Sequence, residues 1–140
     1  MKFAKITFLI AGIWGVLTLT PLYFMFDRIG RQDPPPITHP AFYYGFVGAG
    51  LAFQFVFFVI AIDPVRHRMA MIPSVIEKIS YGGALTVLFL QHRIHPADFG
   101  LGCVDLLFGA LFIAAFFKIP GELKSTIELH GRADPTDSGE

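Results

Sequence analysis

Two long apolar stretches that contain no charged residue constrain the fold of this chain more than any other feature. They cover residues 6–26 and 41–62. An α-helix needs roughly 20 apolar residues to cross about 30 Å of hydrocarbon, and a segment in lipid must satisfy its backbone hydrogen bonds internally. The two stretches therefore predict two membrane-spanning helices.

Two further stretches, residues 69–91 and 97–117, are long enough to cross a bilayer but contain charges. The whole chain is 54% hydrophobic and only 16% charged, whereas an ordinary soluble domain is about 25% charged. A core of this size cannot hide so much apolar surface from water. The sequence thus predicts an all-α integral membrane four-helix bundle over residues 1–119, followed by a polar tail over residues 120–140 that we expect to be partly disordered.

The distribution of basic residues predicts the orientation of these spans. The first span is too long for a secretory signal core and lacks a cleavage site after it, so we expect it to remain uncleaved. With four spans, seven basic residues lie on the side of the N-terminus and three on the other side. Cytoplasmic loops carry the excess of Lys and Arg, which predicts that both termini are cytoplasmic in a multi-pass protein.

Glu77 and Lys78 lie within the third span and are the strongest functional signal. The stem of Lys78 is long enough to carry its ammonium toward the headgroups, so we expect Lys78 to reach the interface. Glu77 has a short stem and needs a partner inside the bundle, because an acid in hydrocarbon is costly. At 1.5 Å per residue, Glu77, Gln54 and Trp14 all lie about 12 Å from the inner boundary.

A second polar level is expected one turn further out, about 18 Å from the same boundary, with Asp105, Tyr81 and Thr18. If the carboxyls of Glu77 and Asp105 approach each other, they would share a proton. The sequence therefore predicts an intramembrane acidic pocket that binds a hydrophobic small molecule or lipid. The predicted ligand-binding residues are Glu77, Asp105, Gln54, Tyr81 and Trp14.

Other functions remain open at this stage. The same polar residues could instead hold helices together in an accessory or structural subunit of a larger membrane complex, as a homo-oligomer or with a partner subunit. An isomerase-like enzyme acting on lipid-like substrates is a further alternative, with its catalytic residues unknown. The chain has no basic block for nucleic acid, and its histidines lie outside the helix interiors, which argues against haem. We expect no cofactor and no metal, although His39, His92 and His95 could form an outer metal site.

Small residues recur at spacings that let helices approach closely. The pairs are Ala11 and Gly15, Gly45 and Ala49, Gly48 and Ala52, Ala110 and Ala114, together with Gly82 and Gly83. We expect them to mediate bundle packing. The phenylalanine-rich residues 53–58 are expected to contact lipid, and Pro21 is expected to kink the first span.

Residues 39–94 resemble a set of small bacterial four-helix membrane proteins that are DoxX-like in architecture and have no settled activity. The elements that carry the resemblance are His39-Pro40, Tyr44-Gly45-Phe46, Gln54, Asp63-Pro64-x-Arg66 and Glu77-Lys78. The resemblance implies a four-helix fold in a bacterial inner (plasma) membrane. In plan alone, a compact bundle with acids on separate helices is also similar to the EXPERA group of eukaryotic sterol isomerases and related ligand-binding proteins.

Overall fold

The computed structural model describes residues 1–32 and 36–119, and this part of the chain is helical throughout, without a strand. Four of its helices have 18 residues or more. The α-helices are α1 (Lys2–Leu19), α2 (Phe26–Gln32), α3 (Pro40–Ile62), α4 (Met71–Leu90) and α5 (Pro96–Lys118), and two short 3-10 helices are η1 (Thr20–Phe24) and η2 (Arg68–Ala70).

Three helical segments in the described residues are long and apolar enough to cross a membrane: Lys2–Phe24, Pro40–Ile62 and Pro96–Lys118. Large apolar side chains on these helices point outward, including Leu17, Phe55 and Phe117, which are 68%, 64% and 76% exposed. Such a surface is stable in lipid and not in water. The chain is therefore a membrane protein. Helix α4 is less apolar, because Glu77 and Lys78 interrupt it.

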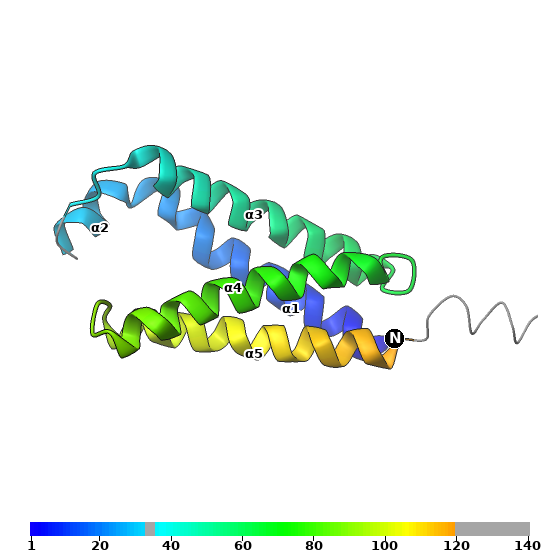
Figure 1. Cartoon of the computed structure of the whole chain (residues 1–140). Helices are drawn as coiled ribbons and strands as arrows, with labels where there is room; N and C mark the ends of the chain where they lie inside the picture. Colours follow the sequence, from blue (N-terminus) through cyan, green and yellow to red (C-terminus); the bar gives the residue numbers. More distant parts are fainter. Residues whose placement is uncertain (33–35, 120–140) are drawn as a thin grey trace, which may run out of the picture.

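The four long helices pack side by side as a ring, in which each helix contacts two neighbours. Helix α1 lies against α3 and α5, α4 lies extensively against α5, and α4 contacts α3 only sparsely. The N-terminus, the α3–α4 connection and the end of α5 lie at one end of the molecule, whereas α2 and the α4–α5 turn lie at the other (Figure 1). The α3–α4 contact is thus the weakest side of the structure.

A cluster of phenylalanine rings closes the bundle near the N-terminal end. Phe8 stacks on Phe112 with ring centroids 4.0 Å apart, and Phe57 meets Phe112 edge-on at 5.0 Å. All three side chains are fully buried. The prediction that residues 53–58 contact lipid is therefore wrong for Phe57, although it describes Phe55. Phe55 and Phe57 have the same side chain, so only their angular positions around α3 decide which of them is buried in the core.

Helix ends are set by local chemistry that the sequence shows. Pro40 and Pro96 each occupy the first turn of a helix, where the missing amide costs little. Pro21, which was expected to kink the first span, lies where α1 gives way to η1. Helix α4 ends in a Schellman motif, in which His92 takes a positive φ of 56° and the amide of Arg93 donates to the carbonyl of Leu88 at 3.0 Å.

The predicted span boundaries agree with the helices to within a few residues, except near residue 26. There the first α-helix is shorter than predicted, and the short helix α2 follows where we expected only a loop. The prediction made for the tail, residues 120–140, lies outside the described residues.

Glycines explain how closely the helices approach. A methyl group on Gly82 would meet the Leu106 side chain at 2.6 Å and the backbone carbonyl of Gly102 at 2.8 Å. Helices α4 and α5 therefore cross at Gly82 and Gly102 with no room for a side chain. At Gly45 and Gly83 the same methyl group would meet nothing within 4 Å. Spacing alone thus identified Gly82 and Gly15 as packing residues but was wrong for Gly45 and Gly83.

Candidate functional site

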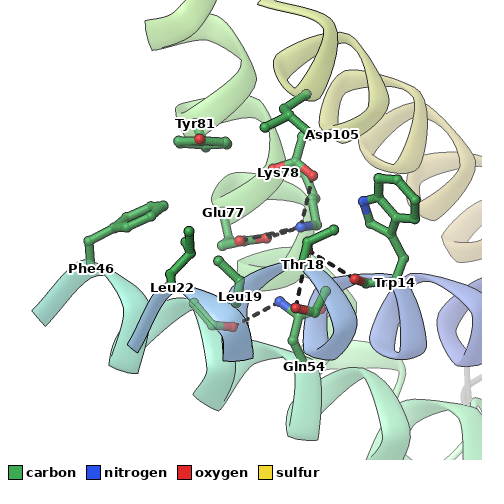
Figure 2. A pocket seen from close by; sticks show the side chains of 13 residues that line it. Trp14, Thr18, Leu19, Leu22, Phe46, Gln54, Glu77, Lys78, Tyr81 and Asp105 are labelled. Carbon is green, nitrogen blue, oxygen red and sulfur yellow. Dashed lines mark hydrogen bonds and ion pairs between the residues drawn. The ribbon is translucent and has the colours of Figure 1, made fainter. Parts of the chain in front are cut away.

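A cavity of about 130 Å³ lies in the middle of the molecule, between α1, α3, α4 and α5. We call it the central cavity. It is directly beside the buried phenylalanines, since the ammonium of Lys78 lies 5.3 Å from the ring centroid of Phe57. Its lining is mostly apolar with a few polar groups, the usual composition of a small-molecule site. The lining residues are Trp14, Gly15, Thr18, Leu19, Leu22, Phe46, Gly50, Gln54, Glu77, Lys78, Tyr81, Leu101 and Asp105 (Figure 2).

All five residues that the sequence singled out as ligand-binding line this one cavity: Trp14 from α1, Gln54 from α3, Glu77 and Tyr81 from α4, and Asp105 from α5. Thr18, placed by the depth argument at the second level, lines it as well. The structure thus brings the two predicted polar levels into a single site. Whether these residues bind a ligand is the subject of the proposal below.

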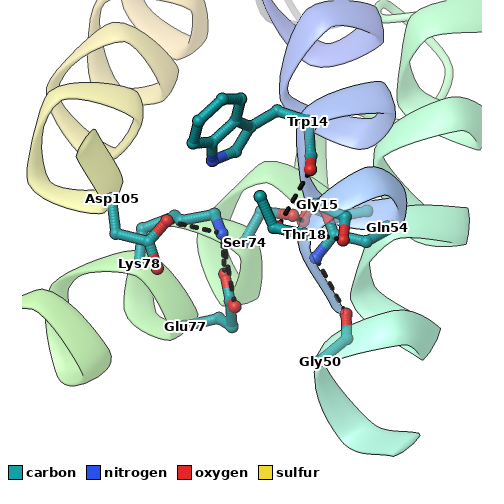
Figure 3. Close-up of polar contacts among 10 residues, drawn as sticks. Trp14, Gly15, Thr18, Gly50, Gln54, Ser74, Glu77, Lys78 and Asp105 are labelled. Carbon is teal, nitrogen blue, oxygen red and sulfur yellow. Dashed lines mark hydrogen bonds and ion pairs between the residues drawn. The ribbon is translucent and has the colours of Figure 1, made fainter. Parts of the chain in front are cut away.

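Lys78 lies between the two acids, in an arrangement that the sequence analysis did not anticipate. Its ammonium donates a hydrogen bond of 3.1 Å to Oδ1 of Asp105 and lies 3.3 Å from Oε2 of Glu77 (Figure 3). The residue is only 4% exposed, so the prediction that Lys78 reaches the headgroups is wrong. The ammonium of Lys78 thus links the two acids. We call these three residues the charged cluster.

The spacing of buried residues explains why Lys78 points inward. The buried positions of α4 recur every three or four residues and face α5; they are Met71, Ser74, Lys78, Gly82 and Leu85. On α5 the same period gives Gly102, Asp105, Gly109, Phe112 and Ala115. A methyl group on Gly109 would lie 3.4 Å from Cβ of Lys78, so the absence of a side chain there makes room for the lysine stem. The alignment of Lys78 with Gly82 was the sequence signal for this.

Gln54 is fully buried, and only one of the two polar atoms of its side chain has a hydrogen-bond partner among the described residues. Its Nε2 donates to the carbonyl of Gly50 at 2.8 Å, while its Oε1 has no hydrogen-bond partner among the described residues. The side chain packs directly against Gly15 of α1, where no other residue type would leave it room. A buried carbonyl oxygen without a donor costs about 1–3 kcal/mol. Gln54 therefore presents an unfilled acceptor inside the molecule.

Glu77 presents a second unfilled acceptor. The Lys78 ammonium forms a long hydrogen bond of 3.5 Å to Oε1 of Glu77, and it approaches Oε2 at 3.3 Å without hydrogen-bond geometry. Oε2 is buried and has no hydrogen-bond partner in the described part of the chain. The nearby Lys78 ammonium stabilises the negative charge on Oε2 but does not donate a hydrogen bond to it. Lys78 is thus committed to Asp105 more than to Glu77.

Aromatic residues form the walls of the cavity. The indole ring of Trp14 points from α1 toward Lys78 and Asp105 (Figures 2 and 3). On the opposite side the rings of Phe46 and Tyr81 lie 5.4 Å apart and join α3 to α4. The hydroxyl of Thr18 is turned back to its own helix, where it donates to the carbonyl of Trp14 at 2.9 Å. The buried polar atoms of the cavity that lack a hydrogen-bond partner among the described residues, Oε1 of Gln54 and Oε2 of Glu77, are acceptors.

The site offers few ligands for a metal, and no group of three His, Cys, Asp or Glu side chains with metal-binding geometry occurs in residues 1–32 and 36–119. Of the histidines considered as outer ligands, His92 serves instead as the left-handed residue that ends α4. The chemistry that this arrangement supports includes the acceptance of hydrogen bonds between aromatic walls.

Comparisons of the chain with known protein families, with curated proteins and with solved structures found no match.

Proposed function

We propose that this protein is a multi-pass protein of a bacterial inner membrane that binds a hydrophobic small molecule or lipid in the central cavity. One observation carries the proposal: two buried acceptors, Oε1 of Gln54 and Oε2 of Glu77, lack donors in a cavity with apolar walls. Buried polar groups in proteins are almost always paired. A guest with a hydrogen-bond donor would satisfy both.

Each residue has a distinct part in this proposal. Gln54 and Glu77 accept hydrogen bonds from the guest, and Trp14 and Tyr81 form aromatic walls beside it. Asp105 accepts a hydrogen bond from the Lys78 ammonium and so fixes where this cation lies beside Glu77. Asp105 is thus a positioning residue that acts through Lys78.

The proposed topology has four crossings, with α4 as the third of them and both termini in the cytoplasm. The charges of α4 are compatible with a crossing because Asp105 pairs Lys78 inside the protein. At the N-terminal end, Arg68 lies 3.8 Å from the ring centroid of Phe116, and Lys118 lies 4.2 Å from that of Phe3. Basic residues stacked on aromatic rings are typical of a membrane interface. The DoxX-like resemblance agrees with this topology.

A second candidate, a subunit of a larger membrane complex, is favoured by the sparse contact between α3 and α4. A helix of a partner chain could pack there and complete the structure. In that case the polar residues of the cavity would only hold helices together.

Native mass spectrometry of the gently extracted protein, combined with its thermal stability, tests the proposal. We expect a retained small molecule or lipid that raises the melting temperature, and a loss of this stabilisation in Glu77→Gln. Asp27→Asn, which removes an exposed acid of α2, serves as the matched control and should behave as the parent protein. If the same molecule stabilises Glu77→Gln as much as the parent protein, Glu77 is not part of the binding site. Mass spectra that show only an assembly with a partner chain would favour the second candidate, a subunit of a larger complex.

A further inference from the structure

An apolar groove of about 520 Å³ runs along the weakly packed side of the molecule, between α3 and α4. We call it the α3/α4 groove. Its lining follows helical spacing on both helices, with Phe46, Ala49, Gly50 and Phe53 from α3 and Pro73, Ile76, Glu77, Ser80, Tyr81 and Ala84 from α4. The stretch of α4 from Pro73 to Ala84 is about 16 Å long. The groove therefore has the length and polarity to hold one alkyl chain.

The groove and the central cavity adjoin each other. Four residues line both of them, namely Phe46, Gly50, Glu77 and Tyr81. Glu77 is thus reached from the groove, while Gln54 lies deeper, in the cavity alone. A molecule that occupies both spaces would have a polar end beside Glu77 and Gln54 and an apolar end between α3 and α4.

The charges of the cavity favour a positively charged polar end. Lys78 supplies one positive charge for the carboxylates of Glu77 and Asp105, and it is closer to Asp105, at 3.1 Å, than to Glu77. With two carboxylates and one ammonium, the charged cluster is left with one uncompensated negative charge, which Glu77 and Asp105 share. Hydrogen bonds between an ammonium and a carboxylate are about twice as strong as those between neutral groups.

We propose that the guest is a single-chain amphiphile whose N–H-bearing cationic head lies in the central cavity and whose alkyl chain lies in the α3/α4 groove. This inference rests on the proposed function and specifies its ligand. The head donates to Oε2 of Glu77 and Oε1 of Gln54, the two acceptors that lack donors. The alkyl chain gains little free energy from leaving lipid for an equally apolar groove. Selectivity among ligands therefore depends on the head, and the groove provides the route by which the ligand enters.

Four probes with the same twelve-carbon chain test the head: dodecylamine, dodecanol, dodecyltrimethylammonium and dodecanoate. Trp14 is the single tryptophan of the chain and lines the cavity, so its fluorescence reports occupancy directly. The full chain is titrated with each probe in phosphatidylcholine nanodiscs. We expect dodecylamine to bind at least about tenfold more tightly than dodecanol, which lacks charge, and than dodecyltrimethylammonium, which lacks a donor. Dodecanoate should not bind.

Two variants test the acceptors separately. Glu77→Gln should weaken dodecylamine by about tenfold or more and change dodecanol far less, because it removes the charge while keeping the shape. Gln54→Leu removes the deeper acceptor without touching the charged cluster and should weaken both probes. Circular dichroism of each variant verifies that its helical content is that of the parent, so a loss of binding is assigned to the site.

A further pair of variants tests the groove. Ala84→Phe places a ring in the α3/α4 groove and should abolish the binding of dodecylamine, whereas Ala110→Phe adds the same ring to an exposed position of α5 outside the groove and should leave it unchanged. The inference is overturned if dodecanol or dodecyltrimethylammonium binds as tightly as dodecylamine, or if Ala84→Phe binds like the parent protein. If dodecanol binds as tightly as dodecylamine, or if dodecanoate binds, and Gln54→Leu removes that binding, the cationic head is wrong while the proposed function stands. If no probe alters Trp14 and native mass spectrometry shows no retained molecule, both are wrong.

Discussion

The ammonium of Lys78 lies 3.1 Å from Oδ1 of Asp105, a hydrogen-bonded ion pair between residues 27 positions apart that links α4 to α5 inside the protein. This pair allows α4 to carry two adjacent charges and still pack against an apolar helix. It also fixes the rotation of α4, since the same face carries Gly82 at the close crossing with α5. The charged cluster is therefore both a packing element and one wall of the proposed site.

Lys78→Met should destabilise the protein strongly. The substitution keeps the length of the side chain but leaves Asp105 without its hydrogen-bond donor, and breaking one side of a buried pair costs about 3–5 kcal/mol. Unfolding in a mild detergent, followed by circular dichroism, measures the change. Lys5→Met, at an exposed position of α1, should change stability by less than about 0.5 kcal/mol.

The double variant Lys78→Met/Asp105→Leu discriminates a specific pair from a general loss of packing. Removing both partners should cost clearly less than the sum of the single substitutions, because the carboxylate of Asp105, which Lys78→Met alone leaves unpaired, is then removed as well. Additive effects of the two substitutions would contradict the pair.

Gly15→Ala should destabilise the protein by about 1–3 kcal/mol through overpacking. The added methyl group meets the buried side chain of Gln54, which cannot move without losing its hydrogen bond to Gly50. Thermal unfolding of Gly15→Ala, Gln54→Ala and the double variant measures the coupling. The double variant should recover much of the loss, and a cycle without coupling would show that the two side chains do not compete for space.

Gly82→Ala and Gly83→Ala should act in opposite directions although the residues are neighbours. At Gly82 the methyl group meets the backbone carbonyl of Gly102 at 2.8 Å, whereas at Gly83 it meets nothing within 4 Å. We expect Gly82→Ala to cost about 1–3 kcal/mol and Gly83→Ala to stabilise α4 by roughly 0.5–1 kcal/mol, the helix propensity difference. Melting temperatures of the two variants check this, and equal signs would contradict the position of the α4–α5 crossing.

The sequence predicted which residues line the central cavity better than it predicted the arrangement of charges there. Depth along each helix is additive, at 1.5 Å per residue, so the levels of Trp14, Gln54 and Glu77 could be compared without knowing how the helices pack. The orientation of Lys78 could not be obtained this way. It depends on which face of α4 meets α5, and a lysine side chain is long enough to reach either the membrane interface or a buried partner.

The packing residues show the same contrast between position along a helix, which the sequence gives, and the face that meets a neighbour, which it does not. Gly45 and Gly83 have the spacing of interface glycines but face open space, and Gly102, which no predicted pair contained, lies at the close crossing. Spacing identifies faces that could pack closely, but the choice among them depends on all side chains around the bundle. Phe55 and Phe57 show the same limit, since their burial differs completely while their chemistry is identical.

His92→Gly should stabilise the protein by about 1 kcal/mol. His92 holds a left-handed backbone conformation, with φ of 56°, that side chains other than glycine adopt at a cost of roughly 1–2 kcal/mol. Chemical unfolding measures the gain. Gln91→Gly provides the control, since Gln91 has φ of −84° and should gain nothing from glycine. A loss of stability in His92→Gly would mean that its side chain contributes more than its backbone costs.

Cysteine labelling tests whether α4 crosses the membrane, which decides between four crossings and three. In a Cys103→Ser background, single cysteines at Arg66, before α4, and at Arg93, after it, occupy exposed positions. A membrane-impermeant maleimide added to sealed inverted vesicles should label Arg66→Cys, and the same reagent added to intact spheroplasts should label Arg93→Cys. A cysteine at exposed Lys5 serves as the cytoplasmic reference and should behave like Arg66→Cys. Labelling of both positions 66 and 93 from one side would place α4 along the membrane surface, where the charged cluster would lie near water and the two unfilled acceptors would need no guest.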